Sequence, residues 1–358
     1  MAFVLMRICY IYGNLYGAKH RSNIVLEALK RNNIEVVECS NRDNGILADL
    51  KSLVRFIFKK GKCDLVLAGF ISQYWLWILK LLTRKKIIMD GYISSYETLV
   101  TERGTYNEKS LKGRLIYALE KSACKLSDKV LIDTNAMIEY FVRLYGIERD
   151  KFARSLECSN TNIFYPRNIK KKTKKFVVLY HGAFLPLHGV NYILEAAKIL
   201  ENDDIEFWIL GKGITLDESL RLAKKLNVKK VKFLGFKPYE EMPLYLAQCD
   251  VGLGIFKILD KNERIIPNKI FELIAMKKPV ITMDAKAIHE LLEDRKSIML
   301  CKAGDSVDLA KKILELKKDN ELRERIAAGG YEEFKKHGSL EVIGREIKEI
   351  AEGLLNEK

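Results

Sequence analysis

Short runs of β-branched and other apolar residues alternate with longer segments of helical periodicity along the whole chain. This alternation is typical of parallel sheets built from βαβ units. In the first half, the apolar runs predict five strands with helices between them. The strands are expected near Val4–Ile11, Glu35–Glu38, Leu65–Ala68, Ile87–Met89 and Val130–Ile132, and the helices include Arg21–Asn32, Leu50–Lys60 and Leu111–Leu126.

A second set of strands follows the charged run 170–175, which has almost no apolar residue to bury and is interpreted as an inter-domain linker. The chain is longer than one hydrophobic core usually organises. We therefore expect two doubly wound parallel-sheet domains, residues 1–168 and 169–338. The final helical segment, 339–358, either extends the second domain or crosses back to the first, and crossing back is the favoured interpretation. Ligands should approach the carboxyl ends of the strands, in a cleft between the domains. The second set of strands is expected at Phe176–Tyr180, Ile205–Leu210, Val231–Phe233, Val251–Ile255, Val280–Met283 and Ile298–Leu300.

Composition excludes several classes of protein. The 358 residues are 48% hydrophobic, which argues against disorder, and no apolar stretch reaches the length of about 20 residues that a transmembrane helix needs. The start lacks the pattern of a signal peptide, so a cytoplasmic location is expected. Seven scattered cysteines without a CxxC pair and five histidines without an HExxH pattern predict reduced cysteines and no protein-encoded metal site.

The net charge of +15 lies mainly in the first half, where residues 1–170 hold 28 Lys and Arg against 17 Asp and Glu. A basic surface attracts nucleotides, nucleic acids and anionic lipids alike, so charge alone does not choose among them. A solvated Lys/Glu-rich surface of the kind found in heat-adapted proteins explains the charge equally well. Nucleic acid is not the expected partner, because the charge is dispersed and no binding module is recognisable.

The most informative segment is KNERIIPNKIFELIAMKKPVI, residues 261–281. Pro267 suits the first position of a helix, and apolar residues continue a helical face behind it. Lys269 then falls in the first turn, with Lys261 and Arg264 just upstream. Cations at the positive end of a helix dipole are misplaced unless an anion joins them, so this turn predicts a receptor for a diphosphate.

Glu272 follows Lys269 on roughly the same helix face and could accept hydrogen bonds from ribose hydroxyls. The alternative is an ordinary surface ion pair between the two residues. Two glycine-containing loops also follow strands, YHGAFLPLHG at 180–189 and GKG at 211–213, where glycine allows close approach of the backbone to a ligand. His188 could donate to a phosphate oxygen or be a structural histidine.

At this point the chain resembles a known family. The runs GAFLPLHGVNYILEAAKIL, LGKG, FLGFKPYEEMPLYLAQCDVGLGIF and IIPNKIFELIAMKKPVIT are similar to the C-terminal domain of family 4 (group 1) retaining glycosyltransferases. MDGYISSYETLVTERG and LSDKVLIDT resemble the first domain of that family more loosely. The resemblance implies the GT-B fold, an α/β architecture of two Rossmann-like domains that face a central cleft.

The resemblance also implies a donor site for a UDP- or GDP-sugar in the second domain, without a metal or other cofactor. Glu272 resembles the second glutamate of the family's EX7E motif, whereas Arg264 stands where the first glutamate is expected. Glu263 is the neighbouring carboxylate that could substitute for it. The segment Gly235–Pro238 would contact the base. The expected donor-binding residues are Gly182, His188, Gly189, Gly211, Phe236, Lys261, Arg264, Asn268, Lys269 and Glu272.

The first domain is expected to hold the acceptor. A basic cluster, Lys19, His20 and Arg21, follows the first strand and could meet an anionic acceptor, or could be a basic helix start of no consequence. Asp90 could orient the acceptor hydroxyl or the donor sugar, or could be a structural or helix-capping aspartate. The expected catalytic residues are thus Asp90, Arg264 and Lys269, and the expected acceptor-binding residues are Gly13, Asn14, Lys19, Tyr96 and Arg103.

The function expected from these patterns is retaining transfer of a sugar to a glycan or lipid-linked acceptor, in the biosynthesis of surface polysaccharides or glycoconjugates. A GT-B sugar-nucleotide epimerase or phosphorylase is the alternative, and a basic nucleic-acid-binding protein is a further one. The segment LKSLVRFIFKKGK, residues 50–62, is apolar with interspersed cations. It is either a Rossmann helix facing the core or a helix that lies on an anionic membrane at the cytoplasmic face.

Overall fold

A computed structural model of the chain describes residues 6–13, 18–40 and 45–357, without the side chains of residues 18–20 and 46. Val4 and Leu5 of the expected first strand, Asn14, and the side chains of Lys19 and His20 lie outside this description. The chain divides into unit 1, Met1–Glu157 with Leu340–Lys358, and unit 2, Cys158–Ser339. The boundary falls before the expected one at 168/169.

Unit 1 contains a six-stranded sheet in the order β2-β1-β3-β4-β5-β6, and every neighbouring pair is parallel. The five strands expected from the apolar runs all form, and a short sixth strand follows them. The strands are β1 (Arg7–Ile11), β2 (Glu35–Glu38), β3 (Leu65–Ala68), β4 (Ile87–Tyr92), β5 (Lys129–Ile132) and β6 (Phe152–Arg154).

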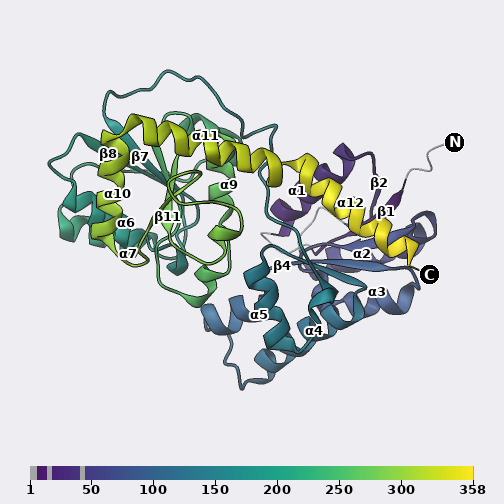
Figure 1. The fold of residues 1–358 in the computed structure, drawn as a ribbon. Helices are drawn as coiled ribbons and strands as arrows, with labels where there is room; N and C mark the ends of the chain where they lie inside the picture. Colours follow the sequence, from purple (N-terminus) through teal and green to yellow (C-terminus); the bar gives the residue numbers. More distant parts are fainter. Residues whose placement is uncertain (1–5, 14–17, 41–44, 358) are drawn as a thin grey trace. The chain divides into compact units, whose positions relative to one another are not determined.

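Helices cover both faces of this sheet (Figure 1). From β2 to β6 every crossover runs in one direction along the sheet, so right-handed connections place α2, α3, α4 and α5 on one face. The connection from β1 to β2 runs the other way, which places α1 on the opposite face. The helices of unit 1 are α1 (Ala18–Arg31), α2 (Ile46–Lys59), α3 (Leu76–Leu82), α4 (Leu111–Leu126), α5 (Asn135–Tyr145) and α12 (Leu340–Asn356).

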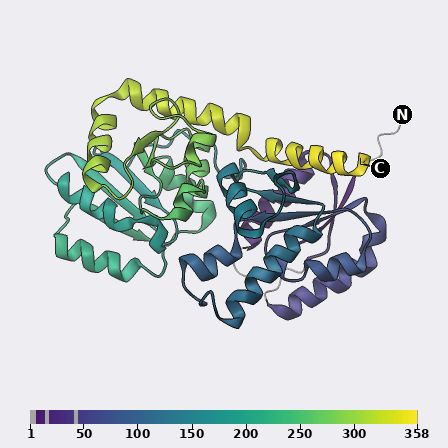
Figure 2. The same cartoon turned by 60° about the horizontal axis from the view of Figure 1, so that its bottom comes forward.

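The last helix, α12, packs along α1 (Figures 1 and 2). Gly344 permits the close approach, because a Cβ atom at this position would lie 2.1 Å from the backbone oxygen of Ala28. Asn32 of the following turn donates to the backbone oxygen of Glu341 at 3.0 Å, and Arg31 pairs with the Glu341 carboxylate. The C-terminal segment is therefore part of unit 1.

Unit 2 repeats the architecture with a second six-stranded parallel sheet, in the order β12-β11-β10-β7-β8-β9. All six strands expected after residue 175 form in this sheet. Their bounds are β7 (Phe176–His181), β8 (Ile205–Leu210), β9 (Val231–Gly235), β10 (Val251–Leu253), β11 (Val280–Met283) and β12 (Met299–Cys301).

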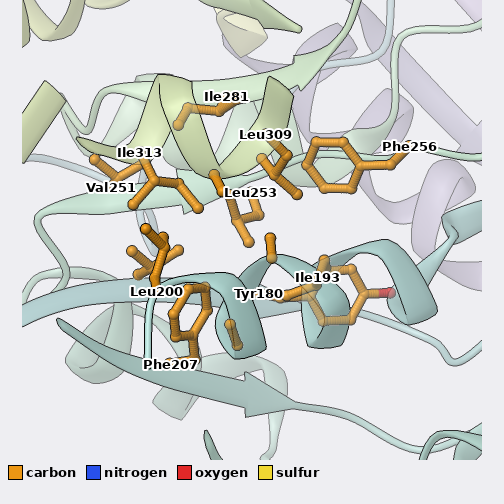
Figure 3. Packing of buried hydrophobic residues seen from close by; sticks show 14 of the residues in the cluster. Tyr180, Ile193, Leu200, Phe207, Val251, Leu253, Phe256, Ile281, Leu309 and Ile313 are labelled. Atoms are coloured by element: carbon orange, nitrogen blue, oxygen red, sulfur yellow. The ribbon is translucent and has the colours of Figure 1, made fainter. Parts of the chain in front are cut away.

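The core of unit 2 forms between this sheet and helices that cover it. Figure 3 shows Leu309 and Ile313 of α10 and Ile193 of α6 beside strand residues such as Val251 and Leu253. Helix α11 packs against α9. The helices of unit 2 are α6 (Val190–Ile199), α7 (Leu216–Leu226), α8 (Met242–Leu246), α9 (Asn268–Ala275), α10 (Ser306–Lys318) and α11 (Asn320–His337).

The charged run 170–175 belongs to unit 2 and does not link the units, in contrast to the sequence interpretation. Lys171 pairs with Asp250, and the backbone nitrogen of Lys172 donates to Gln248 at 3.2 Å. Polar partners rather than apolar burial hold this segment, which is why hydropathy alone does not reveal its place. All seven cysteines are buried thiols that form no disulfide with one another. None of the helices within the described ranges is long and apolar enough to cross a membrane.

Candidate functional site

The carboxyl ends of β7 and β8 meet closely in unit 2. The backbone nitrogen of Gly182 donates to the oxygen of Leu210 at 3.1 Å, and that of Phe184 donates to Lys212 at 2.9 Å. Gly211 has a φ of +140°, and a Cβ atom there would lie 1.9 Å from the Gly182 oxygen. Glycine is therefore required at this position, since any side chain would force the two loops apart.

Lys269 reaches this strand edge from the first turn of α9. The helix begins at Asn268 and is preceded by Pro267, so the expected helix start is correct to one residue. The Lys269 ammonium lies 4.1 Å above the ring of Tyr180, and a Cβ atom built on Gly182 would be 3.1 Å from its Nζ atom. Lys269, Tyr180 and Gly182 thus form one cluster.

The Lys269 ammonium is buried, and the residue is 6% exposed. Among the residues that the structure describes, none offers an acceptor within hydrogen-bond distance of its Nζ atom. Burial lowers the pKa of Lys269 to about 7, with a smaller opposing effect from the charge of Glu272. A desolvated cation that lacks an acceptor is costly unless an anion joins it or it loses its proton. This is the electrostatic situation that the sequence predicted for the turn, except that Tyr180 was not foreseen as its neighbour.

Glu272 lies one turn further along α9 and is 8% exposed. Its Oε2 atom accepts from Nε2 of His181 at 2.6 Å. The alternative of a surface ion pair between Lys269 and Glu272 is wrong, because both residues are buried and the carboxylate contacts the histidine. The other ring nitrogen of His181, Nδ1, is buried and has no hydrogen-bond partner in the described ranges. Sequence reasoning missed His181, although its place directly before Gly182 at a strand end was a signal.

His188 lies in the same loop and is held by its Nδ1 atom. That nitrogen lies 2.7 Å from the Tyr180 hydroxyl and also contacts the backbone oxygen of Ala183. Since a carbonyl oxygen only accepts, Nδ1 carries the proton and Nε2 carries the lone pair. Burial, helped by the charge of Lys269, lowers the pKa of His188 to about 2. Donation from Nε2 to a phosphate, as the sequence suggested, therefore requires a second proton.

The residues before α9 form a short turn beside this loop. Asn262 donates from Nδ2 to the backbone oxygens of Leu187 and Lys257, each at 2.8 Å. Lys261 is buried within the turn, and Arg264 follows it half-buried. Glu263 is exposed, and its carboxylate accepts from the backbone nitrogen of Lys286 at 3.1 Å. The turn that carries Lys261 and Arg264 is thus tied to the loop of His188.

The remaining donor-site candidates lie around the same strand ends. Gly189 directly precedes α6 with a φ of +67°, and a Cβ atom there would lie 2.8 Å from the backbone nitrogen of Lys257. Asn268 is the half-buried first residue of α9. Phe236 follows β9 with 57% of its surface exposed, and Lys212 Nζ lies 4.1 Å over its ring. The exposed Phe236 ring is available to a planar ligand.

The acceptor-site candidates described in unit 1 come from two places in the fold: Gly13 follows β1, whereas Tyr96 and Arg103 flank the short helical turn Glu97–Glu102. Gly13 is buried and donates from its backbone nitrogen to Phe70 at 3.2 Å. Tyr96 is buried in a small cluster with Val100, whereas Arg103 is exposed. Within the described parts of unit 1, no hydrogen bond or ion pair joins Gly13, Tyr96 and Arg103 to one another. Lys19 lies in α1, and Asn14 is outside the description.

Asp90 is closed to solvent at the end of β4. Both of its carboxylate oxygens accept from Arg21, from Nε at 3.2 Å and from Nη2 at 3.3 Å. The side chains are 0% and 3% exposed, respectively. This arrangement favours the structural interpretation of Asp90, and it removes Arg21 from the basic cluster expected to meet an acceptor. The two residues are 69 positions apart, so no local pattern revealed the pair.

The two sheets with their flanking helices define the GT-B fold, as the sequence predicted. The chain is similar over 97% of its length to the crystal structure of Anabaena HepE in complex with UDP, of which it covers 100%, with a TM-score of 0.74 and 16% identity. Sucrose-phosphate synthase from Thermosynechococcus elongatus is similar with a TM-score of 0.75 and 15% identity, over 99% of this chain and 100% of that one. At these identities the likeness concerns the fold alone.

Residues 162–333 match the family described as glycosyl transferases group 1. An uncharacterized glycosyltransferase of Methanocaldococcus jannaschii is 27% identical over 176 residues, which cover 49% of this chain and 48% of the relative. The chain spans about half the length of this relative and of two other curated relatives that it matches. The family match thus covers nearly all of unit 2, where the cluster around Lys269 lies.

Proposed function

We propose that this protein is a glycosyltransferase that moves a sugar from a UDP- or GDP-sugar, bound by unit 2, to a glycan or lipid-linked acceptor bound by unit 1. The acceptor belongs to surface polysaccharide or glycoconjugate biosynthesis, and the protein acts in the cytoplasm. A relative from Rhizobium meliloti, 27% identical over 47% of each chain, is named a lipopolysaccharide core biosynthesis glycosyltransferase, which supports this class of acceptor.

One observation carries the proposal: the buried Lys269 ammonium faces a glycine strand end and has no hydrogen-bond acceptor within the described part of the chain. A donor diphosphate supplies the missing anion. Gly182 leaves room for it, because a side chain there would press on Nζ. The exposed Phe236 ring lies at the neighbouring strand end and suits the base. The family match over residues 162–333 and the UDP complex of the structurally similar HepE support the same donor class.

The proposed chemistry is electrostatic. The bond between the anomeric carbon and the phosphate oxygen breaks, and protonated Lys269 with Arg264 stabilises the negative charge that builds on the diphosphate. The acceptor oxygen forms the new bond to the anomeric carbon on the same face, and its proton passes to the leaving phosphate oxygen. The configuration is retained without a covalent intermediate. We propose that the cations take the place of a divalent metal.

Glu272 is proposed to hold the ribose hydroxyls, and His181 orients its carboxylate through the 2.6 Å hydrogen bond. Arg264, at the position of the family's first EX7E glutamate, is proposed to contact the donor on the sugar side. An arginine there favours phosphate or hydroxyl oxygens, since it can only donate hydrogen bonds. Arg264 would therefore recognise the donor sugar through oxygen atoms of the sugar that accept hydrogen bonds.

A thermal-shift screen with UDP, GDP and their common sugar conjugates tests donor binding, because a ligand that binds only the native state raises its apparent stability. Transfer is then tested by nucleotide release with acceptor glycans, and the anomeric configuration of the product by NMR. Release that requires acceptor supports transfer, whereas release without acceptor favours an epimerase or phosphorylase. Absence of stabilisation by every nucleotide tested contradicts the proposal.

Lys269→Ala tests directly whether the buried Lys269 ammonium acts on the donor diphosphate. We expect it to lower turnover by roughly 10²- to 10³-fold, the effect of removing one donor to a developing oxyanion. Lys225→Ala is the matched control, since Lys225 is an exposed lysine on α7 of the same unit. Near-normal turnover of Lys269→Ala, or an equal loss in the control, defeats the assignment.

A further inference from the structure

Helix α2 is apolar on two opposite faces. One face packs against the sheet of unit 1 through Ala48, Ser52 and Phe56, which are at most 2% exposed. This face satisfies the Rossmann interpretation of the segment, but it leaves a second apolar stripe unexplained. The second stripe recurs at helical spacing on the outer side, with exposures of 44% to 78%: Leu47, Leu50, Val54, Ile57 and Phe58.

The neighbouring helix α3 continues this exposed apolar surface. Trp77 and Leu81 lie one turn apart on α3 and are 48% and 79% exposed. Both helices cover the same face of the sheet, and Lys60 after α2 donates to the backbone oxygen of Leu82 at the end of α3. We call the exposed side chains of these helices the docking face, defined by Leu47, Leu50, Val54, Phe58, Trp77 and Leu81.

Cations border the docking face. Residues 47–86 contain nine Lys and Arg but only two Asp and Glu, a net charge of +7 out of +15 for the whole chain. On a helical projection Lys51 and Arg55 fall directly beside the exposed stripe of α2, between it and the buried face. An apolar stripe with basic residues at its edge is the pattern of a helix that lies in the surface of an anionic bilayer.

We propose that unit 1 docks on an anionic lipid bilayer through this face, with α2 lying in the plane of the membrane surface and the Phe58 and Trp77 side chains inserted. A second copy of the chain is disfavoured, because a two-fold interface sets the same patch against itself and would bring two surfaces of net positive charge together. A bilayer with anionic headgroups is complementary to both the apolar side chains and the surrounding cations.

This inference deepens the proposed function, since docking on a bilayer would bring unit 1 to a lipid-linked acceptor. Only this purpose of the docking rests on the proposed function. Lipid binding itself is measured without donor or acceptor. The donor site lies in unit 2, so a protein that binds anionic vesicles but no nucleotide contradicts the proposed function and leaves the docking intact. The reverse result contradicts the docking alone.

The test is flotation of the full-length protein with phosphatidylcholine vesicles that contain or lack phosphatidylglycerol. We expect co-flotation only with the anionic vesicles, and weaker binding at high salt. Val54→Glu combined with Phe58→Glu should lower binding at least about tenfold. Replacing Lys51, Lys62 and Arg84 by Gln should lower it by about fivefold for each charge removed.

Val307→Glu is the matched control, because Val307 on α10 of unit 2 is 50% exposed and Val54 is 52% exposed. We expect this variant to float like the parent, and all variants to keep the parent's thermal shift with nucleotide. Failure of the parent to float with anionic vesicles, or equal loss in Val307→Glu, overturns the proposal. A dimer in light scattering that Val54→Glu dissociates also overturns it, in favour of a second copy as the occupant.

Discussion

Replacing Lys269 by Met separates stability from function at the candidate site. The ammonium is buried, and its pKa falls from 10.5 to about 7 in the folded protein. Between these two values the unfolded chain binds a proton that the folded chain does not, so stability rises with pH. The destabilisation caused by Lys269 is therefore fully present below pH 7 and is lost above 10.5. Methionine fills a similar volume without a charge.

The size of this destabilisation follows from the shift in the pKa of Lys269. Each pKa unit corresponds to about 1.4 kcal/mol, so the shift amounts to about 5 kcal/mol at neutral pH, as an order of magnitude. We expect Lys269→Met to be more stable than the parent near pH 7, and the difference to shrink by up to about 1.4 kcal/mol for each pH unit above that. At the same time the variant should lose transfer activity, since the cation that faces the diphosphate is gone.

Urea unfolding read by tryptophan fluorescence measures this difference. The chain has three tryptophans, Trp75 and Trp77 in unit 1 and the buried Trp208 in unit 2. In a parent variant that carries Trp75→Phe and Trp77→Phe, Trp208 alone reports the unfolding of unit 2, which contains Lys269. If Lys269→Met is less stable than this parent variant at pH 7, or if their difference does not change with pH, the electrostatic account of the cluster is refuted.

The other predictions concern the same cluster and the packing of α12. The affinity for a UDP- or GDP-sugar should fall by up to about tenfold per pH unit above about 7, because binding needs a protonated Lys269 and the neighbouring His188 is neutral throughout this range. Titration calorimetry across the range measures whether the affinity falls as the pH rises. Gly182→Ala should weaken nucleotide binding, because its methyl group meets Lys269. Gly146→Ala also places alanine at a positive φ, +62°, but with no atom within 4 Å of the new methyl group, and it should leave binding unchanged. Gly344→Ala should destabilise unit 1 by about 1–3 kcal/mol, because its methyl group would overlap the backbone of α1. Gly353→Ala on the same helix has no atom within 4 Å of its methyl group and should be neutral or stabilising, and thermal unfolding compares the two variants. Turnover in EDTA should equal turnover with added magnesium, and activity restored only by the metal contradicts the proposed role of the cations.

Several features of the candidate site could be predicted from sequence because they are local. Pro267 and the apolar periodicity behind it place the start of α9, and that start places Lys269 in the first turn. The burial of the Lys269 side chain could not be predicted from local sequence in this way. The lysine looked like part of a surface cation group, but the side chain lies 4.1 Å above Tyr180, a residue 89 positions earlier whose strand pairs with β8 and β10. His181 was missed for the same reason, since its partner Glu272 is on another element.

By itself the sequence determined the two α/β sheets, their strands and the approximate positions of several helices, because side-chain periodicity and turn residues act over a few neighbouring positions. Only the tertiary structure decided where each apolar face goes. Periodicity shows that α2 is apolar, but the packing of unit 1 covers Phe56 and leaves Phe58 78% exposed. Likewise, only the folded chain joins Arg21 to Asp90 and α12 to α1. Such contacts depend on which distant elements meet, and hydrophobic burial has no directionality that would encode the partner locally.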